Sequence, residues 1–345
     1  MSPSPFKPAW WLRNRHAQTL WPTLGRRRIR LHLRRERLRL PDGDFLDLDW
    51  TRGNAGPGTP LVVVFHGLMG SIESPYARGI LRQIQRCGWR GVFIHFRSCS
   101  GEPNRKDRFY HSGDTGDMAF VVESIKQREP DAQVAAIGYS LGGNALLKWL
   151  GETGSENALA AAVAVSVPFD LQSVADTIHR GFSRTYEKHL IDKLSASVRA
   201  KIRSGSHVMP VTENELRTLK TFWEFDEAIT APLHQFKDAR DYYVTCSARQ
   251  FLPDIRRPSL ILHALDDPFM TPNVLPESHE LSESTQMEVS ERGGHVGFVH
   301  GAFPWSAKYW LEDRIPQYLG AFLNTAPNDT RSQQMPPASK RCKGG

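Results

Sequence analysis

A serine between glycines carries the clearest chemical signal in this sequence. The run Gly138-Tyr139-Ser140-Leu141-Gly142 ends an apolar stretch typical of a buried strand and precedes a stretch typical of a helix. A serine on such a sharp turn presents its hydroxyl as a nucleophile, and the flanking glycines let the helix pass close to the strand. The same pattern also arises by chance in turns without chemical function, so the rest of the chain must decide.

A serine nucleophile needs a general base, and the base needs an acid that orients it. The pair Asp266-Asp267 follows a predicted strand over 259–263. An acidic residue at the carboxyl end of a parallel strand points into the cleft above the sheet. We predict Asp267 as the acid, because the turn begins at Pro268, and keep Asp266 as the alternative.

The base is predicted from two glycines that follow the last predicted strand, in the run Gly293-Gly294-His295. Adjacent glycines let a loop fold tightly, so the imidazole of His295 can lie over the serine. His300 is five residues further on and is not preferred. The chain order serine, aspartate, histidine is the one expected when the nucleophile occupies a strand-to-helix elbow.

Two backbone N–H groups should stabilise the oxyanion that forms when a serine attacks a carbonyl. We predict the amide of Leu141, directly after the nucleophile, and the amide of Leu68, in the His66-Gly67-Leu68-Met69-Gly70 loop after the first parallel strand. His66 is expected to order this loop and to take no part in the chemistry.

The elements that must position these residues alternate between strands and helices. A hairpin is predicted over 28–50, with a turn at Pro41-Asp42-Gly43. Apolar runs predict strands at 61–65, 92–96, 134–139, 160–165, 259–263 and 287–290, and helices at 76–87, 114–128, from 144, at 273–281 and at 306–322. This alternation indicates βαβ units and a parallel sheet.

The alternation stops between about 170 and 250, where the residues are mostly helical and charged. We interpret this segment as a helical cap over one edge of the sheet, with a separate all-α domain as the alternative. The predicted organisation is an N-terminal arm over 1–27, an α/β core over 28–169 and 251–323, a cap insertion over 170–250 and a disordered tail over 324–345. Aromatic residues of the cap segment should form its own core or, alternatively, line an acyl pocket; they are Phe222, Trp223, Phe225, Tyr242 and Tyr243.

The net charge of +7 is concentrated at the two ends of the 345-residue chain. Residues 1–39 carry a net +10 and residues 324–345 a net +3, so the body between them is acidic. The basic N-terminal residues are expected to face solvent on a sheet-edge hairpin. Peripheral contact with an anionic membrane surface, aided by Trp10, Trp11 and Trp21, is the alternative. No recognition element favours nucleic acid.

Cysteine usage and hydropathy favour a cytoplasmic protein. Four scattered cysteines without a CxxC pair argue against a disulfide framework and a zinc site, and no apolar run is long enough to span a membrane. A metal site built from His66, His111, Asp114 and Asp117 is disfavoured, because an aspartate near a helix start usually caps the helix. We predict no metal and no cofactor.

Taken together, these residues resemble the α/β-hydrolase superfamily and, more narrowly, its YheT-like branch. The matching stretches extend from about residue 6 to 323 and include Asn14-Arg15-His16-Ala17-Gln18-Thr19, His66-Gly67-Leu68-Met69-Gly70, Ser74-Pro75-Tyr76, Ser100-Gly101-Glu102-Pro103-Asn104, Tyr110-His111-Ser112-Gly113-Asp114, the serine turn through Gly151, Asp266-Asp267-Pro268-Phe269 and Gly293-Gly294-His295. One departure is Ser98, where the branch usually has glycine, which leaves the local turn geometry open.

The resemblance implies an α/β-hydrolase fold: a mostly parallel, eight-stranded sheet flanked by helices, with an inserted helical cap. It also implies that Ser140, Asp267 and His295 form a charge-relay set in an esterase- or lipase-like enzyme. We therefore predict a serine hydrolase that cleaves short- or medium-chain acyl esters or acylglycerols through an acyl-enzyme on Ser140. The alternatives are an acyltransferase, in which an alcohol intercepts the acyl-enzyme, and a non-catalytic binding protein of hydrolase fold.

Overall fold

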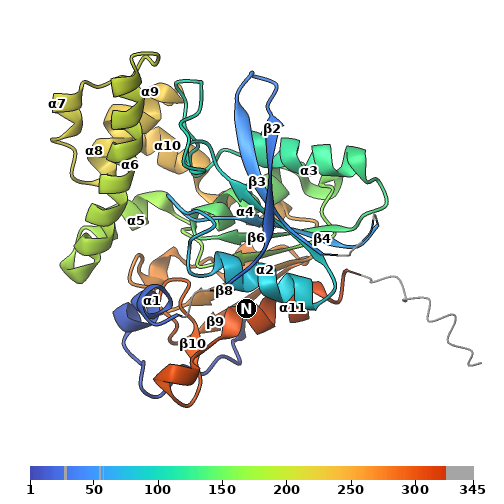
Figure 1. Cartoon of the computed structure of the whole chain (residues 1–345). Coiled ribbons are helices and arrows are strands. Elements are labelled where there is room, and N and C mark those ends of the chain that lie inside the picture. Colours follow the sequence, from blue (N-terminus) through green and yellow to red (C-terminus); the bar gives the residue numbers. More distant parts are fainter. Residues whose placement is uncertain (27–28, 54–55, 57, 324–345) are drawn as a thin grey trace, which may run out of the picture.

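A nine-stranded sheet forms the centre of the computed structural model, which describes residues 1–26, 29–53, 56 and 58–323 (Figure 1). The strand order is β1-β9-β8-β7-β6-β4-β5-β3-β2. The strands are β1 (Ser2–Pro3), β2 (Leu33–Arg39), β3 (Phe45–Thr51), β4 (Leu61–Phe65), β5 (Arg90–His95), β6 (Val134–Tyr139), β7 (Ala161–Val165), β8 (Ser259–Ala264) and β9 (Thr285–Ser290). From β5 to β1 all neighbours are parallel, whereas β3 is antiparallel to both β2 and β5.

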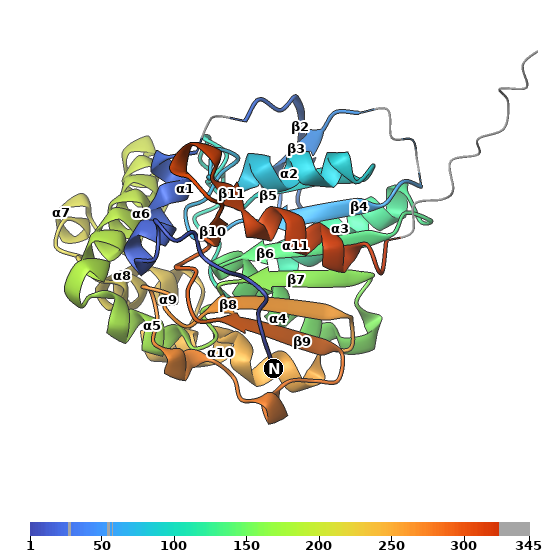
Figure 2. The same ribbon diagram turned by 90° about the horizontal axis from the view of Figure 1, so that it is seen from below.

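Helices cover both faces of the sheet, because its central strands are apolar on both sides (Figure 2). In β4, Val62 and Val64 face the layer that contains α2 (Ala77–Arg86) and α11 (Trp310–Leu319). Leu61, Val63 and Phe65 face the layer that contains α3 (Gly116–Arg128) and α4 (Leu141–Thr153). The two-residue period of a strand thus fills two hydrophobic cores from one continuous apolar run.

This architecture confirms the predicted fold class, with one strand more than expected. The ninth strand is the short β1, which pairs in parallel with β9 at the sheet edge through Ser2 and Pro3. Each of the six strands predicted from apolar runs is present, with bounds that differ by at most two residues.

Three details of the helix predictions are wrong. The helix expected over 273–281 is replaced by two short turns, Pro272–Val274 and Ser278–Glu280. The reason is Pro276, which has no amide hydrogen and disfavours a helix through its position. The closing helix begins at Trp310 instead of 306, after β11 (Lys308–Tyr309) pairs with β10 (Val299–His300). An unpredicted helix, α1 (Arg15–Leu24), lies in the N-terminal arm.

Helices between β7 and β8 form a layer beside the carboxyl ends of the strands (Figure 1). We call them the cap: α5 (Leu171–Ile178), α6 (Arg184–Ser204), α7 (Glu213–Leu216), α8 (Phe222–Phe225), α9 (Ala231–Leu233) and α10 (Ala239–Cys246), with a π-helical turn at Asp226–Thr230. The cap has its own hydrophobic cluster, against which Leu68, Phe109 and Phe269 of the α/β core also pack.

The tail predicted over 324–345 lies outside the described residues, as do Arg27 and Arg28 of the basic arm. Within the described part of the chain, no helix has both the length and the apolar composition needed to cross a bilayer.

Candidate active site

Ser140 occupies the turn between β6 and α4 in a conformation that L-residues rarely adopt, with φ 51° and ψ −118°. The turn is this tight because two glycines allow close backbone contacts. A Cβ at Gly138 would lie 2.4 Å from the carbonyl oxygen of Gly142, and a Cβ at Gly142 would lie 2.5 Å from that of His66. The Ser140 amide donates to the carbonyl of Val165 at 2.8 Å, which fixes the turn to β7.

The imidazole of His295 connects Ser140 with Asp267. Its Nε2 lies 3.0 Å from Ser140 Oγ, and its Nδ1 lies 2.7 Å from Asp267 Oδ2. The carboxylate is almost completely buried, with 1% exposure. Because an ionised carboxylate only accepts, Nδ1 carries the proton and Nε2 is left to accept the serine hydroxyl proton. This arrangement is able to convert a serine into a nucleophile.

The two adjacent aspartates have different contacts. Asp267 reaches the imidazole, and its second oxygen accepts the amide of Phe269 at 2.9 Å. Asp266 instead accepts the amide of Gly294 at 2.9 Å. Burial raises the pKa of Asp266, against the opposing effect of hydrogen bonds from the backbone of Gly294 and Gly293. The structure therefore brings the preferred Asp267, and not the alternative Asp266, to His295.

The loop after β4 lies against the serine: a Cβ at Gly67 would be 3.2 Å from the Ser140 Cβ. The amide of Gly67 donates to the hydroxyl of Tyr76 at 3.0 Å, and the amide of Met69 donates to that of Tyr110 at 2.7 Å. The amide between them, on Leu68, has no acceptor among the described residues, and neither has that of Leu141. The two amides predicted for the oxyanion hole are thus available for a ligand oxygen.

His66 holds this loop in place. Its Nε2 accepts the amide of Phe96 at 3.1 Å, so the proton is on Nδ1, which donates to the carbonyl of Gly67 at 2.6 Å. The ring is fully buried, and this burial lowers its pKa to about 3. His66 is therefore neutral, its two ring nitrogens bond to backbone groups and its ring packs against Phe93 and Phe96, as expected of a residue that orders the loop.

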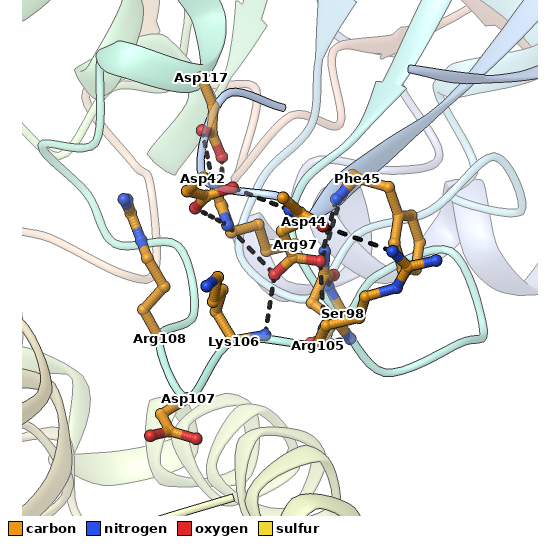
Figure 3. Close-up of polar contacts among 12 residues, drawn as sticks. Asp42, Asp44, Phe45, Arg97, Ser98, Arg105, Lys106, Asp107, Arg108 and Asp117 are labelled. Carbon is orange, nitrogen blue, oxygen red and sulfur yellow. Dashed lines mark hydrogen bonds and ion pairs between the residues drawn. The ribbon is translucent and has the colours of Figure 1, made fainter. Parts of the chain in front are cut away.

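Asp44 anchors the segment that carries Tyr110, because it pairs with the buried Arg97 and accepts the amides of Arg105 and Lys106, both at 3.1 Å (Figure 3). Arg97 forms ion pairs with Asp117 at 2.6 Å, Asp42 at 2.8 Å and Asp44 at 3.2 Å. From the cap, the buried ammonium of Lys201 donates to the carbonyls of residues 106, 107 and 108. These contacts connect the hairpin, α3 and the cap to the loop whose tyrosine fixes the Met69 amide.

A cavity of about 370 Å³ opens at Ser140, a size typical of small-ligand sites. One part of its wall is apolar and belongs to the cap, including Leu171, Ile178 and Val198. Another part is formed by α1 through Thr19, Pro22 and Thr23. The cap aromatics Phe222, Phe225, Tyr242 and Tyr243 line the cavity and also belong to the cap's hydrophobic cluster, so both sequence interpretations apply to them. Trp223 packs against the same cluster and donates to Asp176 at 2.7 Å.

The side chains considered for a metal site bond to other groups of the protein. Asp114 forms an ion pair with Arg108, and Asp117 forms one with Arg97. His111 accepts the amide of Gly113 at 3.2 Å. Among residues 1–26, 29–53, 56 and 58–323, no group of three or more His, Cys, Asp or Glu side chains is arranged to hold a metal ion.

Sequence reasoning missed three residues next to His295. Thr19 Oγ1 accepts the His295 amide at 2.9 Å, Ser166 Oγ accepts the next amide at 3.1 Å, and the ring of Phe269 stacks on the imidazole. The sequence signal for Thr19 is the Asn14–Thr19 motif. Ser166 directly follows β7, as Ser140 directly follows the neighbouring β6, and Asp267 lies three residues after the end of β8.

Comparison with known proteins identifies the family to which the chain belongs. Residues 60–302 match the family model described as the alpha/beta hydrolase fold. The chain is 43% identical to "Putative esterase YheT" of Escherichia coli (strain K12), over 90% of this chain and 91% of that protein. It is 27% identical to "Phospholipase ABHD3" of Mus musculus, over 92% and 79% of the two chains. Among solved structures, the Pyrococcus furiosus esterase Pf2001 superposes with a TM-score of 0.56 at 15% identity, covering 94% of this chain and 98% of that one.

Proposed function

The chain belongs to the α/β-hydrolase family, in its YheT-like branch of esterase-type hydrolases, and on this premise we propose that it cleaves carboxylic esters through Ser140. The observation that carries the proposal is the position of His295, whose two ring nitrogens contact Ser140 and Asp267 at the same time. The apolar cap wall of the cavity supports an acyl chain of short or medium length as the group transferred to the serine.

In the proposed reaction, His295 Nε2 takes the hydroxyl proton while Ser140 Oγ forms a bond to the ester carbonyl carbon. The resulting oxyanion accepts hydrogen bonds from the amides of Leu68 and Leu141. The carbon–oxygen bond to the alcohol then breaks, and His295 returns the proton to the leaving oxygen. Asp267 holds the imidazole in the required tautomer throughout.

Water completes the cycle by the same route. It gives a proton to His295 as its oxygen attacks the acyl carbon, and the bond to Ser140 breaks as the carboxylic acid leaves. Each proton that the imidazole accepts is returned within the same half-reaction, so the chemistry uses only groups of the chain, the ester and water.

The proposal is tested with Ser140→Ala. The variant should lose hydrolysis of p-nitrophenyl esters by several orders of magnitude and should no longer react covalently with a fluorophosphonate probe. Retention of the wild-type circular dichroism spectrum and melting temperature serves as the control for folding. Undiminished hydrolysis by Ser140→Ala contradicts the assignment, and a wild-type protein that reacts with neither reagent favours a binding function.

A further inference from the structure

The helix α1 contacts the segment that carries His295, which we call the histidine loop (residues 293–298). Three consecutive amides of this loop donate to side-chain oxygens from three different parts of the chain. Gly294 donates to Asp266 at 2.9 Å, His295 to Thr19 at 2.9 Å and Val296 to Ser166 at 3.1 Å. The backbone on both sides of the imidazole is therefore fixed by hydrogen bonds.

The hydroxyl of Thr19 has a defined orientation. It donates its proton to the carbonyl of Arg15, one turn earlier in α1, at 2.8 Å. Its lone pairs are consequently free to accept the amide of His295, 276 positions later in the sequence. Asn14 caps the start of the same helix by accepting the amides of His16 and Ala17.

Gln18 attaches α1 to the chain that follows the histidine loop. Its side chain is completely buried, and its Nε2 donates to the carbonyls of Leu12 at 2.8 Å and Val299 at 3.0 Å. Its Oε1 accepts the amide of Val299 at 2.7 Å. A buried amide with every contact satisfied is a strong positional constraint, because losing one partner leaves an unpaired polar group.

The loop also lies in direct contact with the backbone of α1. A Cβ at Gly294 would lie 2.6 Å from the carbonyl oxygen of Arg15, and one at Gly297 would lie 2.3 Å from that of Gln18. The non-glycine residues Val296 and Phe298 have φ values of 58° and 44°. Such conformations persist only where surrounding contacts enforce them.

We propose that α1 is a positioning element of the active site, and that Thr19 and Gln18 hold the histidine loop so that His295 reaches both Ser140 and Asp267. This inference rests on the proposed function, because it concerns the base of that reaction. It assigns a role to the Asn14–Thr19 motif, which the mechanism does not otherwise use.

The test compares Thr19→Val with Thr19→Ser. Valine keeps the branched shape but cannot accept the His295 amide, whereas serine keeps the acceptor. Thr19→Val should lower kcat about tenfold or more with KM close to the wild-type value, because misplacing a base mainly affects the chemical step. Thr19→Ser should restore most of the loss, and the rate of fluorophosphonate labelling should follow kcat in both variants.

Thr218→Val is the matched control, because it removes a hydroxyl bond to the carbonyl three residues earlier, at an exposed site of the cap. It should leave kcat unchanged. Equal kcat for Thr19→Val and wild type, or an equal loss in Thr19→Val and Thr19→Ser, overturns the positioning role. If Ser140→Ala stays active, the proposed function itself fails, so the two failures are distinguishable.

A separate observation concerns an exposed aromatic cluster formed by Trp10, Phe303 and Trp305. These side chains are 66%, 47% and 75% exposed. The rings of Phe303 and Trp305 stack with centroids 4.9 Å apart, and the indole of Trp10 donates to the carbonyl of the neighbouring Ala302 at 2.9 Å. An exposed aromatic group of this size marks a contact surface.

Exposed cations lie near the aromatic cluster. Lys7, Arg13 and Arg15 are close to Trp10 in the sequence, Lys308 is close to Trp305, and Arg292 contacts Arg13. Arg292 donates to the carbonyl of Arg13, which joins two of the segments. None of the five forms an ion pair within the described residues. By contrast, Arg35 and Arg37 on β2, the basic hairpin of the sequence analysis, pair with Asp49 and Asp47. The five charges near the aromatic cluster are therefore free to meet an anionic surface.

We propose that the aromatic cluster and these five cations dock the protein onto the surface of an anionic lipid bilayer. Tryptophan favours the interface between headgroups and acyl chains, and each nearby cation adds attraction to anionic lipid. The helix α1 follows Trp10 and also lines the cavity at Ser140, so docking brings the cavity close to membrane-resident esters. Figures 1 and 2 both show α1 beside β10, from which the loop with Phe303 and Trp305 extends.

Cosedimentation with vesicles tests this proposal. The wild type should bind vesicles of phosphatidylcholine with phosphatidylglycerol, bind phosphatidylcholine alone more weakly, and lose binding in high salt. The variant Trp10→Ser/Trp305→Ser should bind at least about tenfold more weakly while its rate on a soluble ester is unchanged. Val208→Ser/Val244→Ser, which alters two exposed apolar residues of the cap, is the matched control and should bind as the wild type does.

Failure of the wild type to bind anionic vesicles overturns the docking proposal, as does equal binding by the tryptophan variant. Light scattering in the absence of lipid tests the alternative, in which a second copy of the chain covers this surface. A wild-type dimer that becomes monomeric in Trp10→Ser/Trp305→Ser would assign the aromatic cluster to self-association. Both measurements are independent of ester hydrolysis and are made equally well with Ser140→Ala.

Discussion

The ring of Phe269 lies flat on the imidazole of His295, with centroids 4.0 Å apart and 6° between the planes. The amide of Phe269 donates to Asp267, so a single turn supplies both the partner of Nδ1 and the surface on which the imidazole rests. Tyr186 of the cap also packs against Phe269, with ring centroids 5.0 Å apart.

Phe269→Leu tests what the stacking contributes. Leucine keeps apolar volume but has no flat surface, so the imidazole gains rotational freedom. Aromatic pairs contribute about 0.5–1.5 kcal/mol beyond their buried area, which corresponds to a decrease in kcat of up to roughly tenfold. Steady-state kinetics on p-nitrophenyl esters measures this, and an unchanged kcat would show that the stacking does not help to orient the imidazole.

Replacing each aspartate of the adjacent pair should have very different effects. Asp267→Asn removes the carboxylate that selects the His295 tautomer and should lower kcat by about three to four orders of magnitude. Asp266→Asn keeps a carbonyl oxygen that accepts the Gly294 amide and should cost less than about tenfold. A larger loss in Asp266→Asn than in Asp267→Asn would move the acid by one residue.

The turn at Ser98 should be more stable with glycine than with alanine. Ser98 has a φ of 63°, a left-handed conformation that costs an L-residue about 1–2 kcal/mol and that glycine adopts without this cost. Its hydroxyl also accepts the amide of Asn104 at 3.3 Å. Ser98→Ala and Ser98→Gly both lose this bond, but only glycine relieves the backbone, so Ser98→Gly should be the more stable by about 1 kcal/mol in urea unfolding. Equal stability of the two variants would mean that the backbone is not strained there.

Asp226 should make the stability of the cap depend on pH. Burial beside the cavity raises its pKa to about 6, although Thr230 and Tyr243 donate hydrogen bonds that lower it. At pH values between the ordinary pKa of 3.8 and the raised pKa of about 6, the folded state keeps a proton on Asp226 that the unfolded state has lost. The contribution of Asp226 to the free energy of unfolding therefore falls as the pH rises from about 4 to about 6. Asp226→Asn should therefore raise the melting temperature at about pH 8, and this gain should shrink at about pH 4.5. A gain that is equal at both pH values would contradict the assignment.

The sequence predicts features that depend on local spacing. The glycines around Ser140 and before His295 must be close in the chain to allow their turns, so both residues could be identified without a structure. The choice between Asp266 and Asp267 also depends on a local turn, at Pro268. Apolar runs identify the buried strands because each run fills two cores.

Contacts between distant segments could not be predicted in the same way. Nothing in the spacing of Thr19 indicates that it meets His295, because the contact depends on how α1 packs against the finished sheet. The polar partners of Arg97 come from the hairpin and α3, which the sequence separates by more than 50 residues. The turns at 273–281 differ from the prediction for a local reason: Pro276 prevents the helix that the apolar pattern alone indicates.

The contact between Thr19 and the histidine loop has a consequence for how the enzyme matures during translation. The two partners are 276 positions apart, so α1 is made long before the segment that it supports. A nascent chain that has already exposed Ser140 and the cap still lacks Asp267 and His295. On the proposed mechanism, such a chain contains the serine but no general base, so it cannot hydrolyse esters before the histidine loop has been synthesised. We therefore expect premature termination after the cap to yield a product without esterase activity.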